Sequence, residues 1–284
     1  MDLSVVNRYL PMRRLALGIL ALAVLLVIGR NTLGGIRSTP IDPAQVVPLH
    51  QIAPEFRESV SEVIRDNTLH RKGAPETFPC EPKIYLSLLN EPMVTLALWQ
   101  DLSSSPVQLR QLGPNSYEGS DGAGASASWK FVHRSPKLHV MLCHLNYVSP
   151  KGPAKVDARV VLVIHSGFYK EVNGEHWVQH DIEAFVKVDS LGWKTVARTV
   201  RPVGEKILED QVKEAGWFVS LMGRLVAMYP DWASGVVANQ KTINADARDR
   251  FVEVVTETKR PGAFTGRPTL AENSPAVLSE KKRR

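Results

Sequence analysis

The chain of 284 residues contains only two cysteines and lacks the short motifs that identify common catalytic and metal sites. Cys80 and Cys143 are too few to define a disulfide framework, so they are either one bond in an exported domain or two free, buried thiols. No GxSxG, P-loop, HExxH or CxxC sequence is present. The sequence therefore predicts no catalytic residue, no metal site and no cofactor.

In the absence of such motifs, the histidines are the residues to consider as metal ligands or catalytic groups. His176 and His180 have the i, i+4 spacing of a helical metal pair, but the alternation around them predicts a strand. On a strand they would lie about 13 Å apart, too far to share one ion. His144 and His165 stand among apolar strand residues, and we expect both to be core histidines. His180 and its neighbour Asp181 remain the candidates if the protein is an enzyme of cyclase or hydrolase type.

The net charge of +6 belongs to the two ends of the chain. Residues 1–40 and residues 256–284 each carry a net +4, which leaves about −2 for residues 41–255. The middle of the chain therefore has no basic excess to attract a polyanion, and nucleic acid is not an expected partner.

An apolar run from Leu15 to Gly29 lies between Arg14 and Arg30. Fifteen residues are fewer than the ~20 that span a bilayer, but snorkelling arginines extend their reach. We interpret the run as an uncleaved, single-pass transmembrane helix whose partner is the lipid bilayer, with a cleaved signal or a buried soluble helix as alternatives. Three arginines before the run and two after it favour an exported, periplasmic or extracytoplasmic domain.

The chain divides into five predicted segments. Phe56, Val60, Val63 and Ile64 recur at helical spacing and predict a short amphipathic helix, which we expect to cover the long helix described below. The segments are a membrane anchor (1–30), a stalk (31–52), the amphipathic helix and a loop (53–79), an α+β domain (80–232) and a C-terminal extension, basic and disordered at its end (233–284).

Residues 106 to 200 alternate between apolar and polar with a period of two, which is typical of strands. The clearest alternation puts His180, Val186 and Val188 on one face together with Val178, Ile182 and Ala184. Short connections imply antiparallel neighbours, so we expect an antiparallel sheet of about six or seven strands. A helix is predicted at 93–102. The predicted strands are 84–89, 107–112, 116–118, 126–133, 137–148, 159–168, 177–189 and 193–200.

Val203 to Tyr229 reads as one helix, roughly 40 Å long at about 1.5 Å per residue. From Trp217 onward apolar residues surround it, so its second half is expected to be covered on more than one side. Four small residues, Gly216, Ser220, Gly223 and Ala227, fall on one narrow line. That line predicts either close packing against another element or space for a bound molecule.

This order of elements resembles the helix-grip arrangement of the START/SRPBCC superfamily over roughly residues 80–232. A strand at 84–89, a helix at 93–102, the antiparallel strands and the helix from Val203 to Tyr229 carry the resemblance. It implies an α+β fold in which a curved antiparallel sheet wraps the C-terminal helix and encloses a cavity for a lipid or another hydrophobic molecule. A cystatin-like or other α+β sheet domain is the alternative.

Two non-enzymatic functions follow from this interpretation. The first is a membrane-anchored binding module that holds a hydrophobic ligand between sheet and helix. The second is an envelope domain with a solid core that binds a protein partner. The candidate ligand-binding residues are Gly216, Trp217, Phe218, Ser220, Met222, Gly223 and Leu225 on the helix, and Val178, Ile182 and Ala184 on the sheet.

Overall fold

The computed structural model describes residues 41–148, 155–189, 201–260 and 262–268. The predicted transmembrane helix at Leu15 to Gly29 and the predicted strand at Trp193 to Val200 lie outside these residues. Within the described ranges, no helix combines the length and the hydropathy needed to cross a membrane.

The described residues belong to two compact units, and each is considered by itself. Unit 1 holds most of the sheet, and unit 2 holds most of the C-terminal helices. Unit 1 consists of the described residues within 41–75, 106–166 and 180–216, and unit 2 of those within 76–105, 167–179 and 217–268.

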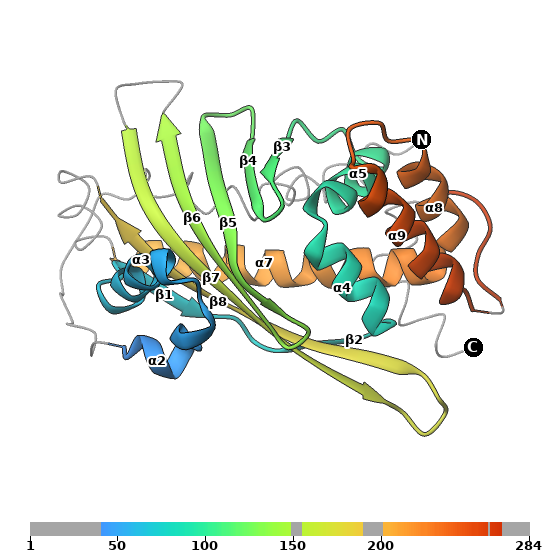
Figure 1. Ribbon diagram of the computed structural model, residues 1–284, viewed down its shortest axis with the longest axis horizontal. Helices are drawn as coiled ribbons and strands as arrows, with labels where there is room; N and C mark the ends of the chain where they lie inside the picture. Colours follow the sequence, from blue (N-terminus) through green and yellow to red (C-terminus); the bar gives the residue numbers. More distant parts are fainter. Residues whose placement is uncertain (1–40, 149–154, 190–200, 261, 269–284) are drawn as a thin grey trace. The chain divides into compact units, whose positions relative to one another are not determined.

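Eight strands of the described chain form one sheet in the order β1-β8-β7-β6-β5-β4-β3, and β2 also pairs with β8 (Figure 1). Strands β3 to β8 are neighbours in both sequence and space, as their short connections predict, and the registers from β3 to β7 are antiparallel. The strands are β1 (Leu69–Lys72), β2 (Glu76–Pro79), β3 (Gln108–Gly113), β4 (Ser116–Ser120), β5 (Ala125–Ser135), β6 (Leu138–Val148), β7 (Lys155–Lys170) and β8 (His176–Val188).

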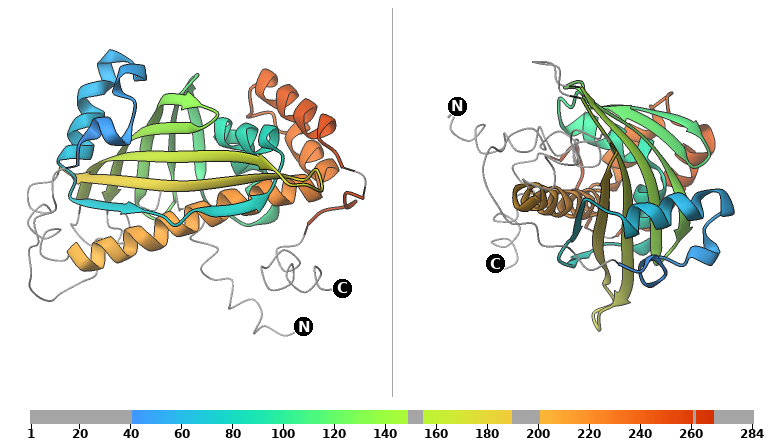
Figure 2. Two further views of the ribbon diagram at one scale, coloured as in Figure 1. Left: turned by 90° about the horizontal axis from the view of Figure 1, so that it is seen from below. Right: turned by 90° about the vertical axis from the view of Figure 1, so that its left-hand side faces the viewer.

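The long helix α7 (Arg201–Met228) confirms the predicted C-terminal helix. In unit 1 its first half lies beside β1, and Figure 2 shows it on the sheet face opposite α3 (Pro54–Arg65). Gly73 follows β1, and a Cβ there would lie 2.8 Å from Cγ1 of Val212. An ion pair of 2.9 Å between Arg71 and Glu205 holds the same contact. The helix therefore approaches the strand so closely that only glycine fits at residue 73.

The amphipathic helix is present as α3, but it does not cover α7 as expected. Its apolar residues Val60, Val63 and Ile64 pack on the other face of the sheet, together with residues of the short helices α2 (Pro43–Val46) and η3 (Leu49–Gln51). The sheet needs this cover because the middle strands are apolar on both faces at this end. The sheet residues beneath α3 are Val132, Val140, Leu142, Val161, Val163 and Phe185.

The predicted strand at Ile84 to Leu89 is wrong, because these residues form helix α4 (Pro82–Asn90). Their buried side chains are Ile84, Tyr85, Leu88 and Leu89, which is helical rather than alternating spacing. Pro82 suits the first helical turn, where its missing N–H costs nothing. The predicted helix at 93–102 is confirmed as α5 (Pro92–Leu102).

Unit 2 also contains two helices from the predicted C-terminal extension, α8 (Pro230–Ala238) and α9 (Ala245–Glu257). Polar contacts tie them to α4 and α5. Trp232 donates a hydrogen bond of 2.9 Å to Asp101, and Lys83 pairs with Glu257 at 2.8 Å. Residues beyond 232 are thus part of the packed unit.

Candidate functional site

A hollow of about 660 Å³ opens on the sheet in unit 1. Residues directly opposite each other on neighbouring strands point to the same side, so the registers define two polar rows across β3 to β7. Arg159 of the first row bonds to Glu62 of α3, which places both rows on the α3 face. The first row is Arg110, Glu118, Ser128, His144 and Arg159, and the second is Gln108, Ser120, Ser126, Asn146 and Asp157.

Short side chains make the middle of this hollow and long ones make its sides. Ser120 on β4 faces Ser126 on β5, and Ser128 follows Ser126 on the same face of β5. Arg110 and Glu118 border them on one side, and Arg159 borders them on the other. The space exists because a serine extends much less far from the sheet than its charged neighbours do.

The charged side chains of the hollow are bonded to one another. Arg110 donates from Nε to Oε1 of Glu118 at 2.9 Å. Asn146 donates to Oδ1 of Asp157 at 2.6 Å. Arg159 donates to both carboxylate oxygens of Asp189, each at 2.9 Å. Each arginine of the hollow is therefore already paired with a carboxylate.

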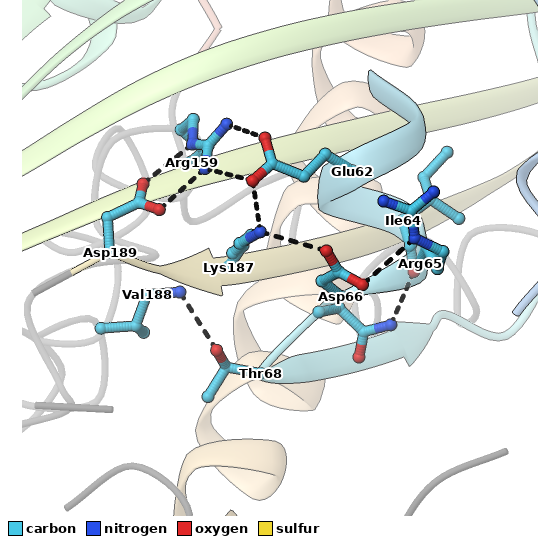
Figure 3. A network of polar contacts seen from close by, with 10 residues as sticks. Glu62, Ile64, Arg65, Asp66, Thr68, Arg159, Lys187, Val188 and Asp189 are labelled. Atoms are coloured by element: carbon cyan, nitrogen blue, oxygen red, sulfur yellow. Dashed lines mark hydrogen bonds and ion pairs between the residues drawn. The ribbon is translucent and has the colours of Figure 1, made fainter. Parts of the chain in front are cut away.

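A network of ion pairs joins Arg159, at one side of the hollow, to α3 (Figure 3). Glu62 accepts hydrogen bonds from Arg159 and Lys187, and Asp66 lies 3.3 Å from Nζ of the same lysine. Hydrogen bonds from Arg159 and then Lys187 lower the pKa of Glu62 to about 2. The bonds from Arg159 to Asp189 and Glu62 raise the pKa of this guanidinium. The network thus stays charged over the physiological range and fixes α3 at the edge of the hollow.

The loop between β4 and β5 is held at the opposite edge by Asp121. Its Oδ1 accepts hydrogen bonds from the backbone N–H groups of Ala123 at 2.7 Å and Ala125 at 2.9 Å. Gly122 and Gly124 adopt φ of +68° and +111°, a conformation that a side chain would strain. The loop therefore sets the strand ends that carry Ser120 and Ser126.

The predicted ligand-binding residues are divided between the two units. Trp217 is half-buried and the others are buried. Gly216, Ile182 and Ala184 lie in unit 1, and Val178, Trp217, Phe218, Ser220, Met222, Gly223 and Leu225 lie in unit 2.

Gly223 and Phe218 show how the second half of α7 packs in unit 2. A Cβ at Gly223 would lie 3.2 Å from Sγ of Cys80 and 3.2 Å from the Phe78 ring, so the helix approaches the segment after β2 closely. Phe218 meets the edge of Trp99, with ring centroids 5.3 Å apart. The line of small residues therefore allows close packing at Gly223. The role of the predicted ligand-binding residues in binding a ligand stays a prediction.

The histidines and cysteines fall in different environments. His144 is exposed in the hollow, so its assignment to the core is wrong: no element of the described chain covers this end of the α3 face. His176 instead pairs with Glu81 of unit 2 at 2.7 Å. Cys80 and Cys143 are free and buried, and burial raises the pKa of each thiol to about 12. Neither thiol is a ready nucleophile at neutral pH.

The residues of the hollow were not predicted from the sequence. The available signal was a change along two strands, from apolar on both faces to polar on one. On β6 the α3 face runs from Val140 and Leu142 to His144 and Asn146, and on β7 Val161 is preceded by Arg159.

No protein family model and no curated protein matches the chain. Three solved structures are similar over part of it. A conserved protein from Geobacillus kaustophilus is 12% identical over 53% of this chain and 94% of its own, with a TM-score of 0.33. The quaternary ammonium Rieske monooxygenase CntA is 16% identical over 73% of this chain and 55% of its own, with a TM-score of 0.25. Ara h 8.0201 is 9% identical over 50% of this chain and 96% of its own, with a TM-score of 0.20. Such low scores carry no argument about function, and the α+β, helix-grip-like description rests on this chain's own sheet and long helix.

Proposed function

We propose that this protein is a non-enzymatic binding module and that the polar hollow of unit 1 is its binding surface. The observation that carries the proposal is a hollow of about 660 Å³ on a sheet face whose other end is covered by α3. This volume lies within the roughly 300–1,000 Å³ of small-molecule sites. Its lining stands on paired strands, which hold side chains more precisely than a loop does.

The hollow offers poor support for catalysis. Ser128 and His144 face each other across β5 and β6, which is the arrangement nearest to a nucleophile and its base. Within the described part of the chain, no hydrogen bond joins the two and none orients the imidazole. Asp157, the nearest carboxylate along the rows, already accepts from Asn146. An activated nucleophile needs a hydrogen bond to its base and a second hydrogen bond that orients the base, so we favour binding over hydrolysis.

The test is to fill the hollow and measure the binding of several small probes. We would titrate the full chain in phospholipid nanodiscs with maltotriose, the peptide Gly-Ser-Gly and citrate, and follow binding by calorimetry. Ser128→Arg places a long side chain in the hollow, and Ser104→Arg adds the same charge at an exposed serine outside it. Binding that only Ser128→Arg abolishes supports the proposal. Absence of binding, or equal binding by both variants, contradicts it.

A hydrophobic ligand in unit 2 is the second candidate, because Trp99 has a buried and unpaired donor. Its side chain is 1% exposed, and Nε1 has no acceptor in the described residues. Buried indole N–H groups usually have a partner. The carbonyl or carboxylate of an amphipathic ligand would supply one beside Phe218. Trp99→Phe removes the donor but keeps an aromatic ring, so it should reduce uptake of a fluorescent fatty acid; unchanged uptake would reject this candidate.

We further propose that Leu15 to Gly29 anchors the module in a bilayer, with the remainder exported. The apolar run and its flanking arginines support this proposal. The full chain should then resist extraction from membranes by alkaline carbonate, and a chain without residues 1–30 should be released. Release of the full chain by the same wash would contradict the anchor.

A further inference from the structure

The hollow contains charges of both signs, and they are paired with one another. Its lining includes two arginines and three carboxylates, and each arginine is bonded to a carboxylate. Asp157 is bonded to Asn146 and lies 3.7 Å from Nζ of Lys155. Because the arginines and carboxylates alternate and pair, the hollow presents no concentrated charge of one sign that would attract a charged ligand. The pairing pattern therefore gives neither an anion nor a cation an advantage over a neutral ligand.

Four hydrogen-bonding groups without a partner in the described chain remain in the hollow. Within the described residues, the hydroxyls of Ser120, Ser126 and Ser128 and the imidazole of His144 have no hydrogen-bond partner. Each hydroxyl can donate one hydrogen bond and accept two, and a neutral imidazole can donate one and accept one. Their positions in the registers place facing groups about 5 Å apart across strands and groups two residues apart about 7 Å along a strand. These four groups form a fixed array of hydrogen-bond donors and acceptors.

We propose that the hollow binds a neutral, hydroxyl-rich ligand, an oligosaccharide, through Ser120, Ser126, Ser128 and His144. This inference rests on the proposed function and specifies its ligand class. Saccharide hydroxyls also donate and accept at once, so they match the array without disturbing the ion pairs around it. The long paired side chains of Arg110 and Glu118 on one side, and of Arg159 and Asp189 on the other, bound the ligand.

A peptide fits the same surface less well. Peptides that bind to sheets gain specificity from pockets that receive alternate side chains. Both polar rows lack an apolar side chain. A peptide would bury its own side chains against hydroxyls and ion pairs, whereas a saccharide has none to place.

The experiment is a calorimetric titration of the full chain in phospholipid nanodiscs, which contain no glycoside detergent. The neutral probes are maltotriose, cellotriose and chitotriose. We expect at least one to bind, with an affinity that does not change between about 0.05 and 0.5 M NaCl because the ligand is uncharged. Ser126→Ala combined with Ser128→Ala should weaken it by roughly tenfold, through the loss of two hydrogen bonds. Ser104→Ala is the matched control and should bind as the unmodified chain does.

Failure of all three saccharides to bind, or equal binding by the double variant, would overturn the inference. Binding of citrate or of Gly-Ser-Gly that Ser128→Arg abolishes, without saccharide binding, would overturn the ligand class and leave the proposed function intact. No binding of any probe would reject both.

Discussion

The same strands of unit 1 carry two different surfaces on the face that bears α3. At one end the face is apolar and covered by α3. At the other it is polar and opens into the hollow. The covered positions are Val132 on β5, Val140 and Leu142 on β6, and Val161 and Val163 on β7; the open positions are Ser126 and Ser128 on β5, His144 and Asn146 on β6, and Asp157 and Arg159 on β7.

The pairing of β6 with β7 continues without a register shift through both ends, so the difference between the ends of these strands lies in side-chain chemistry. Apolar side chains gain about 25 cal/mol per Å² when α3 removes them from water. Hydroxyls gain nothing comparable and would need new partners if covered. Arg159 marks the change, because it bonds to Glu62 on the covered side and lines the open side. A rigid sheet with one end left uncovered is a suitable floor for a binding site.

The largest expected effect comes from weakening the covered end. Ile64 of α3 is 0% exposed and belongs to the core beneath the helix. Ile64→Ala should lower the free energy of unfolding by about 2–5 kcal/mol through lost burial and the cavity left behind. Urea denaturation of the full chain measures the change. A loss below about 1 kcal/mol would mean that α3 contributes little to the fold.

The ion pairs between α3 and the sheet should contribute less. Lys187 has a side chain only 8% exposed and pairs with Glu62 and Asp66. Lys187→Met would leave both carboxylates without this partner and should cost about 2 kcal/mol, below the ~3–5 of a fully buried pair because the carboxylates are partly solvated. Lys206→Met is the matched control on the exposed side of α7, and it should change the free energy of unfolding much less because its ion pairs are open to solvent.

A double-mutant cycle separates pairing from packing. If Lys187 acts mainly through Glu62, Glu62→Gln should reduce the effect of Lys187→Met. Additive effects of the two substitutions would show that Lys187 acts through Asp66 or through packing of its stem, and not through Glu62.

Acid should weaken the same contact. The folded-state pKa of Glu62, about 2, lies below its ordinary value of 4.5, so its pairing stabilises the fold fully above pH 4.5. This contribution is lost as the pH falls from about 4.5 towards 2. The stability difference between the unmodified chain and Glu62→Gln should therefore shrink over this window, as measured by urea midpoints at several pH values. A difference that is constant down to pH 3 would contradict the pairing.

Much of the fold could be predicted from local patterns. The long helix has apolar residues at helical spacing over more than twenty positions, and six of the predicted strands show period two, so neighbouring residues reinforce each assignment. Short elements lack that reinforcement. Strands β1 and β2 have four residues each, and the apolar run from Ile84 to Leu89 is too short to separate a helix from a strand by eye.

The candidate site was harder to predict because it depends on long-range pairing. Alternation assigns Ser128, His144 and Arg159 to strand faces, but only the registers place them in one row. Whether that row is open depends on where α3 lies, and an amphipathic helix does not specify which surface it covers. His144 was assigned to the core for this reason: its neighbours in sequence are apolar, but its neighbours in space are not.

The smallest expected change in the free energy of unfolding is for a substitution at the open end of the sheet, and it is to be compared with that of Ile64→Ala at the covered end. Ser128 is exposed and makes no hydrogen bond within the described residues. Ser128→Ala should therefore change the free energy of unfolding by no more than about 0.5 kcal/mol in urea denaturation. A hydroxyl that stabilises nothing in the folded chain is available to a ligand at no cost to the fold. A loss of more than about 1 kcal/mol would show that this hydroxyl already has a partner, and the array proposed for the ligand would then lack one of its members.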